Sequence, residues 1–154
     1  METLEELVYA AAVRRLDKQE HVLGELRATT GILLAASSLT ASFLGQRAIV
    51  AGRLGVLVVL ALVSFAILVA AALYVLAPRQ AFAFAVSAAR VYEDAVAESL
   101  DSVDVVRRLA YELDRVSDGN DRSLARFTRA FRVATLGLGV ETALLLAAVS
   151  ATIF

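Results

Sequence analysis

The sequence predicts an all-α protein: a helical integral membrane protein with three transmembrane helices, an N-terminal helix and a cytoplasmic amphipathic helical arm between spans two and three. Two observations predict this fold class. Hydrophobic residues make up 59% of the 154 residues, and the mean hydropathy is +0.71, which is too apolar for an ordinary soluble domain. Three long apolar stretches also interrupt the charged sequence, and each is long enough to cross a bilayer as a helix.

The clearest span is the stretch at residues 54–77, which holds 24 uncharged residues between Arg53 and Pro78. As a helix it would be about 36 Å long, enough to cross a hydrocarbon core of about 30 Å with some tilt. A soluble core helix rarely needs so long an uninterrupted apolar run. We therefore take residues 54–77 as the second transmembrane helix.

The first span is predicted at residues 28–46, a run of 19 uncharged residues between Arg27 and Arg47. It is rich in hydroxyl side chains, including Ser37, Ser38 and Thr40. A helix of this composition packs inside a bundle or lines a polar path, and both interpretations stay open. The short link to the next span predicts a helical hairpin.

Two cytoplasmic segments flank these spans. Residues 1–27 predict an N-terminal helix that starts at a capping box, Thr3 with Glu6. Residues 78–132 predict a helical region, and turn-forming residues at 117–120 are expected to end its first helix. A new helix should start near Asp121 and continue into the third span, residues 133–154. One apolar stripe marks the first of these helices: Val96, Leu100, Val103, Val106, Ala110 and Leu113.

The distribution of Lys and Arg predicts the orientation in the membrane. Thirteen of these residues lie in the segments 1–27 and 78–132, and two lie in the hairpin link. Because basic residues are retained on the cytoplasmic side, the N-terminus and residues 78–132 are expected in the cytoplasm.

Glu141 stands out because it lies nine positions after Arg132, about 13 Å into the third span. A carboxylate at that depth is costly, so it is expected to face an interior. It could line a pore or act as a gate, together with Ser37, Ser38 and Thr40. Alternatively, it could be neutral and hydrogen-bonded to a hydroxyl of Ser37, Ser38, Thr40 or Ser64. Gly137 and Gly139 beside it favour tight helix contacts, within the subunit or between copies.

A basic stripe precedes the third span. Its members suit contacts with anionic headgroups, which would anchor the helix at the cytoplasmic face. They also suit an anion or phosphate site, because the guanidinium group binds phosphate in a bidentate manner. The phosphate candidates are Arg107, Arg108, Arg115, Arg122, Arg126 and Arg129, the first three expected on a facing helix.

The sequence lacks the signatures of catalysis, so no catalytic residue is expected and the protein is not expected to be an enzyme. There is no phosphate-binding loop and no nucleophile motif. The chain has no cysteine and only one histidine, His21. This composition also argues against a metal site or another cofactor. A net charge of −1 implies no bulk attraction to nucleic acid.

The layout resembles a known family. The small-residue span beginning Gly31-Ile32-Leu33, the apolar span ending Ala77-Pro78-Arg79 and the Arg-rich approach to the last span carry the resemblance. Over nearly its whole length the chain resembles the transmembrane effectors of bacterial Pycsar antiphage defence and, more loosely, SLATT-type effector domains. The resemblance implies a homo-oligomer in the bacterial inner membrane that impairs membrane integrity. It also implies a cyclic nucleotide signal made during infection, such as a cyclic pyrimidine nucleotide.

Two other functions fit the same sequence. The chain could be a non-catalytic membrane scaffold or accessory subunit that binds a partner protein through its cytoplasmic helices. It could also be a small channel or transporter unrelated to defence.

Overall fold

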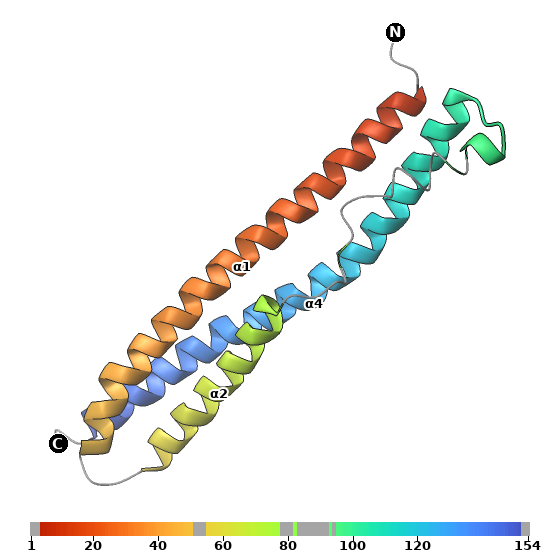
Figure 1. Cartoon of the computed structure of the whole chain (residues 1–154). Coiled ribbons are helices and arrows are strands. Elements are labelled where there is room, and N and C mark those ends of the chain that lie inside the picture. Colours follow the sequence, from red (N-terminus) through yellow and green to blue (C-terminus); the bar gives the residue numbers. More distant parts are fainter. Residues whose placement is uncertain (1–3, 51–54, 78–81, 83–92, 94, 152–154) are drawn as a thin grey trace. The chain divides into compact units, whose positions relative to one another are not determined.

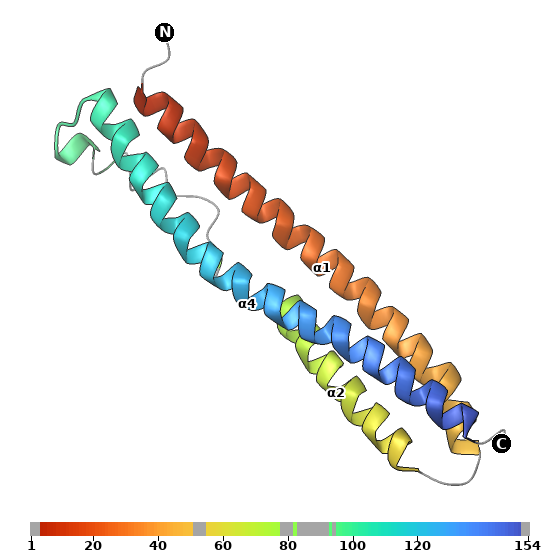
Figure 2. The same cartoon turned by 180° about the vertical axis from the view of Figure 1, so that it is seen from behind.

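The structure is a computed structural model that describes the backbone of residues 4–50, 55–77, 82, 93 and 95–151, and the same side chains except 44 and 47–50. Three long helices account for most of it: α1 (Leu4–Val50), α2 (Val56–Leu76) and α4 (Ser102–Ser150) (Figures 1 and 2). The described part of the chain contains no β-strand. The all-α prediction is confirmed.

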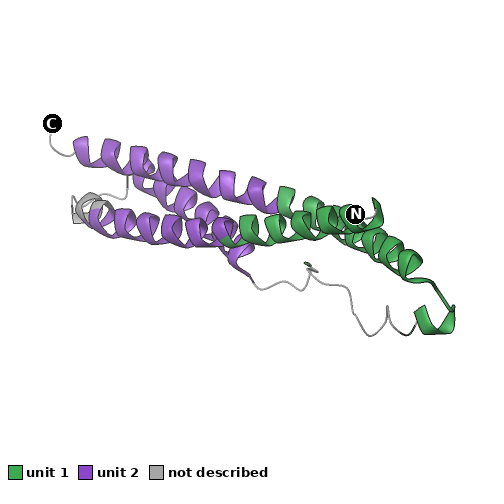
Figure 3. Cartoon of the chain, turned by 90° about the horizontal axis from the view of Figure 1, so that it is seen from above, with its two compact units in different colours: residues 1–24, 79–125 green, residues 25–78, 126–154 purple. Residues whose placement is uncertain are grey.

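The chain divides into two units (Figure 3). Unit 1 consists of residues 1–24 and 79–125, and unit 2 consists of residues 25–78 and 126–154. Helices α1 and α4 contribute residues to both units, whereas α2 belongs to unit 2.

Unit 1 is built on a helix pair. The first part of α1 packs against the first part of α4 through buried Ala12, Leu16 and Leu113, with Tyr9 and Leu109 beside them. Buried side chains follow one another at alternating intervals of three and four residues, which is the spacing of coiled-coil packing. These positions are 12, 16, 19 and 23 in α1 and 110, 113, 117 and 120 in α4.

Unit 2 brings three helices together. Leu33 of α1, Leu68 of α2 and Ala134 of α4 form its main apolar cluster. Val58 and Ala148 form a second cluster. Each helix therefore contributes one packed stripe to a common interior.

The outer faces of unit 2 are apolar as well. Large hydrophobic side chains are exposed on every helix, for example Ile32 of α1, Leu62 of α2 and Leu136 of α4. Polar groups lie inside instead, since Thr30, Ser37 and Glu141 are buried. A surface of this kind is typical of helices that face lipid.

Among the described residues, two helices are long and apolar enough to cross a membrane, α2 and α4, as judged by length and composition. This agrees in outline with the predicted spans at 54–77 and 133–154 and indicates possible membrane association. The segment 28–46, predicted as the first span, is helical within α1. The predicted helix start at Thr3 lies outside the described residues.

The predicted turn at residues 117–120 is wrong, because α4 is continuous from Ser102 to Ser150. Ser117 and Asn120 are buried in the helix pair of unit 1 and do not face water in a loop. The helical structure is interrupted earlier in the sequence, just before α4 begins. Ser99 there has a positive φ of 50°, and Asp101 accepts a hydrogen bond from the Ser102 backbone N–H at 2.7 Å. The predicted apolar stripe is interrupted: Val96 and Val103 are exposed, and only Ala110 and Leu113 are buried.

Gly137 lies at a close contact between α4 and α2. A Cβ atom at this position would lie 3.1 Å from Cβ of Leu68 and 3.6 Å from the backbone oxygen of Ser64. At the same contact, the Ser64 hydroxyl donates a hydrogen bond to the Gly137 carbonyl at 3.0 Å. The expected tight contact at this glycine therefore occurs within one chain.

We expect Gly137→Val to destabilise unit 2 by about 1–3 kcal/mol, because the added methyl groups would force α2 and α4 apart. The matched control is Gly139→Val, two residues along the same helix, where a Cβ meets nothing within 4 Å. That variant should stay within about 0.5 kcal/mol of the parent. Reversible unfolding in mixed micelles by titration with SDS measures both, and equal losses would contradict the role assigned to Gly137.

Candidate functional site

The candidate site lies in unit 2 around Glu141. This side chain comes from α4 and is 1% exposed, although carboxylates are seldom fully buried. The hydroxyl of Ser37 on α1 donates a hydrogen bond to Glu141 Oε2 at 2.5 Å. The other carboxyl oxygen, Oε1, is buried and has no hydrogen-bond partner among the described residues.

The other hydroxyl candidates do not join this pair. Ser38 donates to the Leu34 carbonyl at 2.9 Å, and Thr40 donates to the Ala36 carbonyl at 3.0 Å. Both bonds link a side chain to the preceding turn of its own helix, a common arrangement for hydroxyl residues in helices. Among the hydroxyl residues predicted as partners of Glu141, Ser37 is the one that forms a hydrogen bond with it.

A cavity of about 410 Å³ that opens at the outer surface adjoins the pair, entirely within unit 2. Its lining comes from the second part of α1, from α2 and from α4, and includes the Glu141 side chain. Apolar side chains such as Val58, Leu62 and Phe65 form much of the wall, and Ser42 and Gln46 add polar groups. The only buried carboxyl of the described part of unit 2 therefore borders open space.

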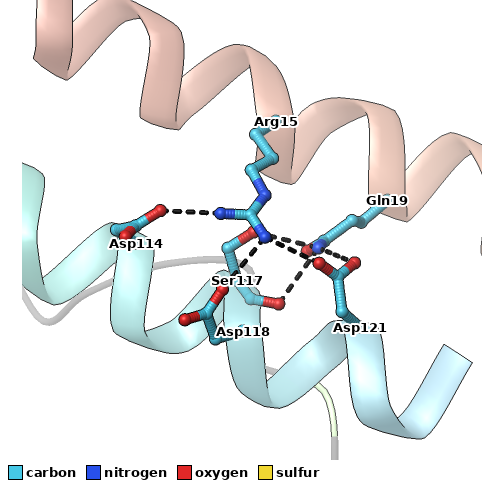
Figure 4. Close-up of polar contacts among 6 residues, drawn as sticks. All are labelled: Arg15, Gln19, Asp114, Ser117, Asp118 and Asp121. Carbon is cyan, nitrogen blue, oxygen red and sulfur yellow. Dashed lines mark hydrogen bonds and ion pairs between the residues drawn. The ribbon is translucent and has the colours of Figure 1, made fainter.

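Unit 1 contains a separate polar network (Figure 4). Arg15 extends from α1 toward three carboxylates on α4 and forms ion pairs with Asp114 at 2.7 Å, Asp118 at 3.0 Å and Asp121 at 2.7 Å. The three acids lie at i, i+4 and i+7, so they share one helical face. One cation thus pairs with three anions at the rim of the helix pair, and the group of four side chains keeps a net negative charge.

Gln19 completes this network at a buried position. Its amide nitrogen donates to the Ser117 carbonyl at 3.0 Å, to the Ser117 hydroxyl at 2.9 Å and to Asp121 at 2.6 Å, with one of its two N–H groups shared between two acceptors. A buried polar side chain at a coiled-coil core position fixes the register of the two helices, because shifted registers leave it unpaired. The network accounts for the burial of Ser117 inside a continuous helix.

The network also sets the charge state of Asp121. The hydrogen bond from Arg15 holds the pKa of Asp121 below its ordinary value of 3.8, partial burial opposes this, and the bond from Gln19 adds to it. A carboxyl whose pKa is lowered by folding stabilises the folded state above its ordinary pKa, and this contribution is lost as the pH falls through the folded value.

We therefore expect the thermal stability of unit 1 to fall as the pH is lowered from about 5 to about 2, where Asp121 takes up a proton. In the Arg15→Gln variant the same titration should change stability less, because the main cause of the lowered pKa is gone. Circular dichroism melting curves across this pH range measure both. Identical pH profiles for parent and variant would contradict the assignment.

The six arginine candidates all lie on α4, so the expectation that three of them sit on a facing helix is wrong. Arg107 pairs with Asp104 at 3.0 Å and lies 3.6 Å from Glu5, and Arg108 pairs with Glu98 at 2.9 Å. The other four are exposed: Arg115 and Arg122 in unit 1, and Arg126 and Arg129 in unit 2.

The spacing of these arginines favours separate contacts. Arg108, Arg115 and Arg122 follow at intervals of seven residues, about 10 Å along the helix axis. These three arginines therefore suit separate phosphates, whereas Arg126 and Arg129, three residues apart, are close enough to share one. A row of this kind suits several phosphates, such as those of neighbouring lipid headgroups.

The network of Arg15, Gln19 and Ser117 was not among the features predicted from the sequence. Its signal was present, because positions 117 and 120 continue the three-and-four spacing of the apolar residues before them. The described residues hold no group of three His, Cys, Asp or Glu side chains placed to bind a metal ion. Comparisons with protein-family models, curated proteins and solved structures find no significant match to this chain.

Proposed function

We propose that this protein is an integral membrane effector with three spans, in which unit 2 lies in the bilayer and opens a path across it in response to a signal. The observation that carries the proposal is the buried pair of Glu141 and Ser37. A carboxyl placed inside a bundle with apolar outer faces is costly to keep, and such groups commonly mark ion or proton paths.

In the resting state the pair holds the second part of α1 against α4. Thr30, Ser37 and Glu141 then face the interior of unit 2, away from lipid. A signal that separates these helices would let water enter between them. The hydroxyl and carboxyl groups would then line the opened path. Such a signal must bind the open state better than the closed state, because equal binding would shift nothing.

The resemblance to Pycsar effectors supports a cyclic nucleotide as the signal and a bacterial inner membrane as the location. The distribution of Lys and Arg supports a cytoplasmic N-terminus and a cytoplasmic segment 78–132. Homo-oligomerisation follows from the same proposal, since one bundle of three helices encloses too little space for a conducting path.

Dye release from vesicles that contain the full-length protein tests the proposal. One cyclic nucleotide among cyclic UMP, cyclic CMP and the purine cyclic nucleotides should trigger release. Glu141→Gln should alter the triggered rate by tenfold or more, about 1.4 kcal/mol in the opening equilibrium. Gly139→Ala, an exposed position on the same helix, should leave it unchanged. No release with any nucleotide from correctly inserted protein would overturn the gated-effector proposal.

A second candidate is a membrane scaffold that binds a partner protein through unit 1. A groove of about 430 Å³ between α1 and α4 favours it, because exposed Leu4, Val8 and Tyr111 line its apolar wall. A photo-crosslinking residue in place of Tyr111 should then capture one defined partner in cells. The absence of any crosslinked product, with triggered dye release intact, would reject the scaffold.

A further inference from the structure

The cavity beside Glu141 has the composition of a ligand site. Its volume of about 410 Å³ lies within the range of small-molecule pockets, about 300–1,000 Å³. Val58, Leu62, Phe65 and Leu145 give it an apolar wall. Among the described side chains that α1, α2 and α4 contribute to its lining, Glu141 is the only titratable group.

The carboxyl group of Glu141 has bonding capacity to spare. Ser37 serves Oε2, whereas Oε1 is buried without a hydrogen-bond partner among the described residues. A buried oxygen in this state carries a desolvation cost that a bound hydrogen-bond donor would remove. The ligand should therefore bring a donor to Oε1.

The remaining chemistry narrows the ligand class. A bare Na⁺ or Ca²⁺ ion needs more oxygen ligands than one carboxyl, Ser42 and Gln46 provide. An anion would find no cationic side chain to pair with among the described residues that line the cavity. A protonated amine fits, because its N–H groups donate to the carboxyl while its apolar body packs on Leu62 and Phe65.

We propose that this cavity binds a lipophilic amine, a small apolar molecule with one ammonium group, with Glu141 as its counter-ion. The inference rests on one part of the proposed function, the placement of unit 2 in the bilayer, and does not require gating.

When the amine binds, its ammonium group replaces the proton of the Glu141 carboxyl. Without ligand, the buried carboxyl is more stable in its neutral form, because only Ser37 donates to it. When the ammonium group enters, the carboxyl O–H bond breaks, its proton passes to water, and an ammonium N–H donates to the carboxylate. One proton is released for each amine bound, so affinity rises up to about tenfold for each unit of pH while the free carboxyl is protonated.

The test uses the full-length protein in lipid nanodiscs and dicyclohexylcarbodiimide, which labels protonated carboxyls in apolar surroundings. The carboxyl O–H adds across one C=N bond of the reagent, and the adduct rearranges to a stable N-acylurea with no leaving group. Mass spectrometry should place the label on Glu141, and Glu141→Gln should abolish it at this position.

The probe is 1-adamantylamine, and its matched control is 1-adamantanol, which has the same apolar body without the charge. At a concentration about ten times its Kd, the amine should slow labelling about tenfold, and the alcohol should slow it far less. Gly45→Val keeps Glu141 but fills the cavity at a position where a Cβ meets nothing within 4 Å. This variant should lose the protection.

Each alternative outcome overturns the inference. Equal protection by amine and alcohol would show an apolar pocket without a counter-ion, and no label on Glu141 would show a carboxyl closed off from the cavity. Protection that is unchanged in Gly45→Val would place the amine elsewhere. Dye release that fails while amine protection holds would reject the proposed gating alone, so the two failures are distinguishable.

Discussion

Ser37→Ala should destabilise unit 2 by about 1–3 kcal/mol, since it leaves both oxygens of the buried Glu141 carboxyl without a partner among the described residues. Alanine removes the hydroxyl at nearly the size of serine, so the loss reports the hydrogen bond and not overpacking at this buried position. Unfolding by titration with SDS in mixed micelles measures the effect.

A double-mutant cycle separates this pair from general packing. Glu141→Leu removes the carboxyl that Ser37 serves, so Ser37→Ala should cost much less in that background. Ser38→Ala is the matched control one residue away, because the Ser38 hydroxyl is exposed and bonds to its own helix. A coupling energy near zero, or an equal effect at Ser38, would refute the structural role of the pair.

Arg15→Glu should weaken the helix pair of unit 1 by about 2–3 kcal/mol. Three ion pairs would be lost, each worth about 0.5 kcal/mol because the Arg15 side chain is 41% exposed and water screens the charges. A fourth carboxylate would also face Asp114, Asp118 and Asp121, which adds repulsion of similar size. Amide hydrogen exchange in residues 4–24 and 102–125 should accelerate accordingly.

The neighbouring Arg14 provides the control for this prediction. It is exposed on α1, and Arg14→Glu makes the same charge change away from the three acids. Asp118→Arg introduced together with Arg15→Glu should restore part of the protection by reversing one pair. Equal acceleration in the Arg14 and Arg15 variants would mean that net charge, and not the network, controls this helix pair.

The apolar helix expected at residues 54–77 was the most predictable part of the fold. The uncharged stretch at 54–77 matches α2 (Val56–Leu76) closely, because apolar length alone determines where such a helix can start and end. The polar site was predictable in part. Burial of Glu141 was predicted from the cost that an exposed carboxyl would have in lipid, but the choice of Ser37 over Ser38 depends on helix rotation, which only packing determines.

The segment at 117–120 shows where local sequence misleads. Ser, Asp, Gly and Asn all favour turns, because their side chains or flexibility compete with helical hydrogen bonds. In the folded chain Gln19 donates hydrogen bonds to the Ser117 hydroxyl and carbonyl, and Arg15 forms an ion pair with Asp118. Tertiary partners 98 to 103 residues away in sequence thus override the local preference.

The central claim is that unit 2 lies in the bilayer with three spans. The most direct test is whether a water-soluble reagent reaches the segment 28–46. The chain has no cysteine, so single variants report unambiguously. Ile32→Cys places a thiol on the exposed apolar face of α1, and Glu20→Cys places one in the segment predicted to be cytoplasmic. Both are treated with a charged, membrane-impermeant maleimide in intact and inverted vesicles.

The account predicts that Ile32→Cys reacts on neither side until detergent is added, and that Glu20→Cys reacts only in inverted vesicles. Rapid reaction of Ile32→Cys in either kind of intact vesicle would place this face in water and contradict the three-span account.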